Sequence, residues 1–212
     1  MLFHTPAFLF LFLPIFFFLY YYTFKYSKFF HEYILVTAGI FFYAWWNVYL
    51  TPIIILSIIF NFYFGQLIKN NFENNSKKRT LIFSIFLNIL FLAVFKYADF
   101  IIENINYLFN FNIDLLNLPF PLAMSFFTFQ TIAYLVDCHN GDIKNTRFTQ
   151  YSLFIIFFPQ LIAGPIVKYN HMMTQFENTN NRIINRKNLN LGLVIFLIRL
   201  FKKIILADNL AI

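Results

Sequence analysis

Residues 52–97 read PIIILSIIFNFYFGQLIKNNFENNSKKRTLIFSIFLNILFLAVFKY, two apolar runs on either side of one basic loop. Each run, 52–68 and 80–97, approaches the roughly 20 apolar residues with which an α-helix crosses about 30 Å of hydrocarbon. Lys and Arg collect in the cytoplasmic loops of membrane proteins. The stretch therefore predicts two transmembrane helices joined by a cytoplasmic loop, 69–79.

The composition extends this prediction to the whole chain. Of its 212 residues, 60% are hydrophobic and 12% are charged, and the mean hydropathy is +0.65. Soluble domains carry about 25% charged residues, so this chain has too little polar surface to coat a water-soluble fold. Its net charge of +7 lies in short loops, which favours an orientation signal over a nucleic-acid surface. We predict an all-α polytopic membrane protein with a single transmembrane domain, 1–212.

Cysteine and histidine are too sparse for a disulfide framework or a metal site, and we expect no bound cofactor. Cys138 is the only cysteine, and we expect it at the cytoplasmic end of its helix, where thiol reagents should reach it. His4, His31 and His139 are expected in loops or at the terminus. His171 has a pKa suited to a general base, but a solvated loop residue is the simpler interpretation.

Five further membrane-embedded segments and one interfacial segment complete the predicted architecture, which has six to seven membrane-embedded helical segments. The region 99–118 mixes Asn and acidic residues with Ile, Leu and Phe, and predicts a helix that lies in the outer interface. The other apolar segments are 7–24, 33–50, 119–137, an interrupted segment at 150–167, and 190–212.

The segment 150–167 has basic loops on both sides, so a full crossing would put one of them on the wrong side of the membrane. We predict that it dips into the membrane and returns. Pro159 and Pro165 break the helical hydrogen bonds, Gly164 lets the chain turn, and Gln160 can satisfy freed carbonyls. The alternative is a single kinked span that ends at Pro165.

Four motifs follow one another along the chain: KYADF (96–100), SFFTFQTIAYLVD (125–137), FFPQLIAGPIVKY (157–169) and FKKIILADNLA (201–211). In this order they resemble the membrane-bound O-acyltransferase family, and within it the bacterial membrane subunits that O-acetylate alginate and peptidoglycan. The second and third motifs are the most specific, because a generic helix bundle has no need for their mixture of Gln, Asp, Gly and Pro. Residues 123–124 and 139–141 depart from the family pattern.

The resemblance implies an enzyme of the bacterial inner membrane with a tunnel that crosses the bilayer. Acetyl-CoA or a similar donor on the cytoplasmic side would give its acetyl group to a polysaccharide or peptidoglycan hydroxyl, or to an extracytoplasmic partner protein. The essential histidine of the family lies in its C-terminal half. The resemblance therefore implies that this chain is an N-terminal part that lacks the catalytic residue and is inactive alone.

The tunnel of the family suggests roles for five residues of this chain, Gln130, Asp137, Gln160, Gly164 and Pro165. Gln130 and Asp137 lie seven residues apart and so share one helical face. Gln130 can line the tunnel or hold a neighbouring helix through its amide. Asp137 lies at the inner end of its helix. It can have a role in the tunnel or can contact a basic loop.

Lys168, Lys202 and Lys203 are predicted to face the cytoplasm, where they can attract the phosphates of a donor or anionic lipid. The helix at 190–212 also carries Arg199, so it lies low in the inner leaflet or faces a polar cavity. Two other classes of protein fit the same pattern. A secondary transporter or flippase uses broken helices at a midplane site, and a membrane scaffold needs no catalytic residue.

Overall fold

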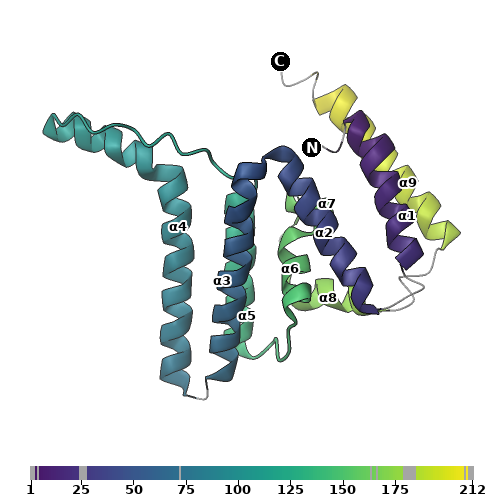
Figure 1. Cartoon of the computed structure of the whole chain (residues 1–212), viewed down its shortest axis with the longest axis horizontal. Helices are drawn as coiled ribbons and strands as arrows, with labels where there is room; N and C mark the ends of the chain where they lie inside the picture. The colour runs from purple at the N-terminus through teal and green to yellow at the C-terminus, as the bar shows by residue number, and fades with distance from the viewer. Residues whose placement is uncertain are drawn as a thin grey trace.

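The structure, a computed structural model, describes residues 3, 5–23, 28–71, 73–162, 164–165, 167–178, 185–207 and 209. Within these residues it contains helices and no strand, which confirms the predicted all-α class. In chain order the helices are η1 Phe8–Phe12, α1 Leu13–Thr23, α2 Lys28–Trp46, η2 Val48–Leu50, α3 Thr51–Asn70, α4 Asn74–Phe109, α5 Met124–Asn140, α6 Phe148–Ile156, α7 Phe158–Leu161, α8 Tyr169–Glu177, α9 Arg186–Phe201 and η4 Lys202–Ala207 (Figure 1).

Two helices in the described part of the chain are long and apolar enough to cross a membrane, Val48–Asn70 and α4. They contain the two runs from which the membrane class was predicted, and they stand side by side as an antiparallel pair (Figure 1). Pro52 occupies the first turn of α3, where its missing amide costs no hydrogen bond. The two helices support the membrane class, whereas the total number of crossings stays a prediction.

The interfacial helix expected at 99–118 is not a separate element. Instead α4 runs on to Phe109, bends near its far end (Figure 1), and stops where Asn110 adopts a left-handed conformation with φ of 52°. Residues 111–121 then return without regular secondary structure. Side chains of α4 bind the backbone of this returning segment, which explains how it keeps an ordered path outside a helix.

The core of the molecule lies where α2, α3, α5 and α6 meet. In α6, all of whose residues are described, every residue from Gln150 to Ile156 is buried. Tyr43, Ile54 and Tyr134 are fully buried members of the same core, contributed by α2, α3 and α5. By contrast, α9 and η4, also described throughout, have no buried residue. The core is therefore built around the shortest of these four helices.

The chain reverses its direction between α6 and α8. The side chain of Asn170 in α8 donates to the carbonyl of Asp142, which lies in the loop before α6 (2.9 Å). The ring of Phe176 packs against that of Phe157 with centroids 5.2 Å apart. Both ends of the interrupted segment thus lie at the same end of the molecule, as expected of a chain that dips and returns. Its position relative to a membrane stays a prediction.

Three expectations about single residues are wrong. His31 lies buried in the first turns of α2, not in a loop, and its ring centroid is 3.9 Å from that of Tyr20. His139 belongs to the last turn of α5, because that helix ends at Asn140 and not at 137 as predicted. Cys138 is 1% exposed, so a thiol reagent cannot reach it in the folded chain. His4 lies outside the described residues.

Candidate functional site

The end of α6 frees backbone carbonyls, and two neighbouring helices meet them. The last carbonyls of a helix have no partner within it. Gln130 of α5, 1% exposed, donates its side-chain amide to the carbonyl of Phe154 at 2.7 Å. The carbonyl of Ile156 faces Gly39 of α2, where a Cβ atom would collide with that oxygen. A glycine on one helix and an amide on another therefore let the break in α6 be buried.

Gln160, Gly164 and Pro165 come together in the turn after α7. The amide of Gly164 donates to the carbonyl of Gln160 at 2.9 Å, and the side chain of Gln160 donates to the carbonyl of Pro165 at 2.9 Å. A Cβ on Gly164 would overlap the side chain and backbone of Gln160. Gln160 thus binds a carbonyl in the break, which is the contact predicted for it. In the described residues no hydrogen bond joins this turn to Gln130.

A polar cleft of about 430 Å³ opens at the end of the molecule where the loop between α5 and α6 lies. Its walls come from the end of α3, from this loop, from the start of α6 and from the end of α8. The residues that line this polar cleft are Gln66, Asn70, Lys144, Asn145, Thr146, Arg147, Gln150 and Glu177. None of the eight residues predicted for the tunnel or for the donor is among these described lining residues.

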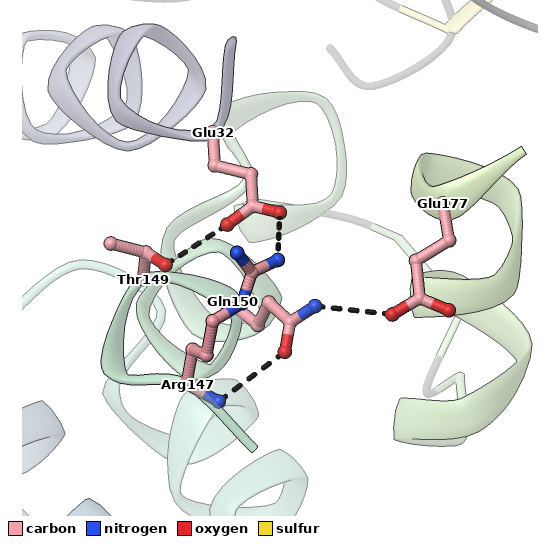
Figure 2. A network of polar contacts seen from close by, with 5 residues as sticks. All are labelled: Glu32, Arg147, Thr149, Gln150 and Glu177. Carbon is pink, nitrogen blue, oxygen red and sulfur yellow. Dashed lines mark hydrogen bonds and ion pairs between the residues drawn. The ribbon is translucent and has the colours of Figure 1, made fainter. Parts of the chain in front are cut away.

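A network of ionic and polar contacts fixes the mouth of the polar cleft (Figure 2). The carboxylate of Glu32 at the start of α2 pairs with the guanidinium of Arg147 and accepts a hydrogen bond from the hydroxyl of Thr149 at 3.0 Å. The amide of Gln150 donates to the carboxylate of Glu177 at 3.1 Å. The network connects α2, α6 and α8, and places the Glu32 charge near the positive N-terminus of α6.

A cluster of tyrosines lies among the same helices. The ring of Tyr134 packs against those of Tyr151 and Tyr169, with centroids 4.3 Å and 5.5 Å apart. Burial raises the pKa of the Tyr169 phenol from its ordinary value near 10 to about 12. The amine of Lys69, at the end of α3, is also buried and has no hydrogen-bond partner in the described chain. The tyrosine cluster thus joins α5, α6 and α8 through aromatic contacts.

The remaining predicted site residues lie apart from the polar cleft. Asp137 is buried on the same face of α5 as Gln130, as their spacing predicted, and it interacts with the charges of Lys168 and Asp142. Lys168 precedes α8 and is exposed. Lys202 and Lys203 are exposed on η4, which has no buried residue of its own. The structure therefore brings Asp137 and Lys168 together, but not with the lysines of η4.

Sequence reasoning missed a pair of asparagines that joins the two long helices. Asn61 and Asn88 exchange hydrogen bonds through their side-chain amides, at 3.1 Å and 2.7 Å. Each amide also donates to the carbonyl four residues before it, that of Ser57 or Ser84. The signal was present, because both apolar runs contain the same S-x-x-x-N spacing and a buried amide in a membrane requires a partner.

The polar contacts that Glu32 and Arg147 make could not be found in this way, because the two residues lie 115 positions apart. The loop 141–147 was noted for its charges, but only as a signal of orientation. What joins it to the N-terminus of α2 is the packing of α2 against α6.

The helical architecture and its two long apolar helices define the class, an all-helical membrane protein. The chain belongs to the membrane-bound O-acyltransferase family, whose model matches residues 2–212. This finding confirms the resemblance that the four motifs indicated.

Curated bacterial relatives match the whole chain or half of it. It is 40% identical to a peptidoglycan O-acetyltransferase of Helicobacter pylori, covering 100% of this chain and 45% of that protein. It is 31% identical to a probable alginate O-acetylase AlgI of Azotobacter vinelandii, covering 100% and 42%. A teichoic acid D-alanyltransferase of Lacticaseibacillus rhamnosus is 26% identical over 50% of the chain. The chain thus spans less than half the length of these relatives, and no solved structure matches it.

Proposed function

We propose that a protein containing this chain is a membrane O-acetyltransferase of the bacterial inner membrane. It would move an acetyl group from a cytoplasmic donor, acetyl-CoA or a similar thioester, to a hydroxyl of an extracytoplasmic polysaccharide or peptidoglycan, with a partner protein on that side. The observation that carries the proposal is the family match over 2–212, together with similarity along the whole of this chain to parts of relatives that are named as a peptidoglycan O-acetyltransferase and a probable alginate O-acetylase.

The distribution of charge supports a donor site at the polar cleft. The basic loop 69–79 and the loop 141–147 lie at the same end of the molecule, which the positive-inside rule assigns to the cytoplasm (Figure 1). Lys144 and Arg147 line the polar cleft there, and cations of this kind bind phosphate groups. Lys168, Lys202 and Lys203, which lie outside the polar cleft, are then left to contact anionic lipid.

We also infer that the segment 150–167 enters the membrane from the cytoplasmic side and returns to it. Support comes from the reversal between α6 and α8, and from the bonds that Gln130 and Gln160 make to carbonyls near the break. Irregular backbone at membrane depth is tolerated where protein buries it. Acyl transfer also needs a base, and no histidine lines the polar cleft in the described residues. The role proposed for this chain is therefore to hold the donor.

The proposal is tested by kinetics on a protein that contains this chain at the length of its relatives. Lys144→Gln should raise the KM for acetyl-CoA about tenfold and change kcat less, because a charge-assisted contact of about 1.4 kcal/mol is lost. Lys78→Gln is the matched control, since Lys78 is an exposed cation outside the polar cleft. Equal effects of both variants would remove the donor site from the polar cleft. No transfer of labelled acetyl to any glycan hydroxyl by the unaltered protein would refute the proposed function itself.

A further inference from the structure

The far end of α4 forms a projection that we call the arm, residues 98–117. It consists of the last turns of α4 and the irregular segment that returns along them. In Figure 1 the arm turns away from the rest of the bundle. Side chains of the helix bind the returning segment at two points. Asp99 accepts a hydrogen bond from the amide of Asn117 at 3.1 Å, and Asn106 binds both backbone groups of Ile113 at 2.8 Å and 3.0 Å. The arm is thus one ordered unit.

The helical part of the arm has two different faces. At 100° per residue, positions i, i+4 and i+7 form a stripe, and two stripes of this kind lie about 160° apart on the arm. One stripe is apolar and the other is polar, and the irregular segment returns along the polar stripe. The apolar stripe is Ile101, Ile105 and Leu108, and the polar stripe is Asp99, Glu103 and Asn106.

The tip of the arm exposes large apolar side chains next to one another. Tyr107 is 84% exposed, Leu108 70%, Phe109 63% and Phe111 55%. A run of this kind marks a surface that contacts a partner or a membrane. Aromatic rings are enriched where hydrocarbon meets water, since their apolar bodies and polar edges suit both sides. The composition of the tip therefore favours a membrane interface.

The position of the arm along α4 gives the same answer. Arg79 at the basic end and Asp99 at the start of the arm are 20 residues apart, so they lie about 30 Å apart along the helix, the thickness of the hydrocarbon. The arm contains acidic residues and neither Lys nor Arg, which suits the face opposite the basic loops. Its contact with lipid then depends on apolar insertion and not on attraction to anionic headgroups.

We propose that the arm lies in the membrane interface opposite the basic loops, with its apolar stripe and tip among the acyl chains. The polar stripe and the returning segment face water. The occupant of this apolar surface is lipid. The proposal concerns only the arm, and it does not depend on the enzymatic activity.

Fluorescence quenching in phosphatidylcholine vesicles tests this placement. Leu108→Cys and Glu103→Cys put a thiol-linked dye on opposite stripes, and the unaltered chain is the blank because Cys138 is buried. A spin label near the lipid headgroup should quench the dye at 108 by about half, as expected at 5–10 Å depth, and iodide should quench it weakly. The dye at 103 should show the reverse. Phe111→Cys gives an independent measurement at the tip.

Two outcomes would overturn the proposal. Strong quenching by iodide at both 108 and 111 would place the arm in water. Protection of both positions from iodide and from the lipid label would show that protein covers the tip. Far-ultraviolet circular dichroism of each variant confirms that the helices are retained, and these positions are exposed, so their folding should be unaffected.

Discussion

The helices α4 and α6 are both apolar, and they use their apolar surfaces in opposite ways. In α4, described from end to end over 36 residues, the buried positions are Ser84 and Asn88, which are both polar. In α6, described over all of its nine residues, seven consecutive residues are buried. The longer helix therefore faces outward with its hydrocarbon side chains, and the shorter one forms the core.

The difference is the one expected if α4 crosses the membrane and α6 ends inside it, as we propose. Lipid tails are as apolar as leucine, so an uninterrupted helix gains little by burying its apolar face and turns its few amides towards protein. A helix that stops inside the membrane leaves carbonyls that lipid cannot bind. Protein must supply the donors, as Gln130 does for Phe154. The break at the end of α6 thus requires that this helix be buried in protein.

The largest effect should come from the same substitution made in both helices. Phe154 is 1% exposed in α6, and Phe86 is 58% exposed in α4. Phe154→Ala should lower the free energy of unfolding by about 3–5 kcal/mol, since it leaves a cavity. Phe86→Ala should change it by about 0.5 kcal/mol or less. Titration from mild detergent into dodecyl sulfate, followed by tryptophan fluorescence, measures both. Equal losses would mean that α4 is as closely packed as α6.

A smaller effect should distinguish two helical glycines. At Gly39 a Cβ would collide with the carbonyl of Ile156, whereas at Gly192 in α9 it would meet nothing within 4 Å. Gly39→Ala should destabilise the chain by about 1–3 kcal/mol, because α2 must move away from the end of α6. Gly192→Ala should be neutral or gain up to about 1 kcal/mol of helix propensity. The same detergent titration reports both, and a neutral Gly39→Ala would refute the close contact between α2 and α6.

The smallest effect concerns the Asn61–Asn88 contact, by which α4 binds α3. A double-mutant cycle with Asn61→Leu and Asn88→Leu should give a coupling of about 0.6 kcal/mol, a usual value for hydrogen bonds between membrane helices. Asn104→Leu, with Asn61→Leu, is the control cycle, since Asn104 bonds only within α4 in the described contacts. Coupling of the same size in the control would show that the Asn61–Asn88 bonds do not join the helices.

Local signals in the sequence predicted the parts of the fold that depend on local physics. The apolar runs predicted α3 and the first part of α4, and Pro159 and Pro165 predicted the interrupted segment. These features rest on helix length and on the missing amides of proline.

Features that join distant segments could not be predicted in this way. The contacts between Glu32 and Arg147 and the polar cleft arise from the packing of α2, α3, α6 and α8. The register in which helices pack is not written in the pattern of one segment. The return of the irregular segment after α4 was missed for a related reason. Its order depends on Asp99 and Asn106, which bind backbone groups seven to eighteen residues away.

The brevity of α6 has a consequence for how the chain is made. A helix of nine residues spans about 14 Å, roughly half of the hydrocarbon thickness, so it cannot partition into a bilayer as an independent segment. The two helices against which it packs most, α2 and α3, both precede it in the chain. Synthesis from the N-terminus therefore delivers α6 to the membrane only after these two partners have been made. The order of the segments along the chain is then also a workable order of insertion.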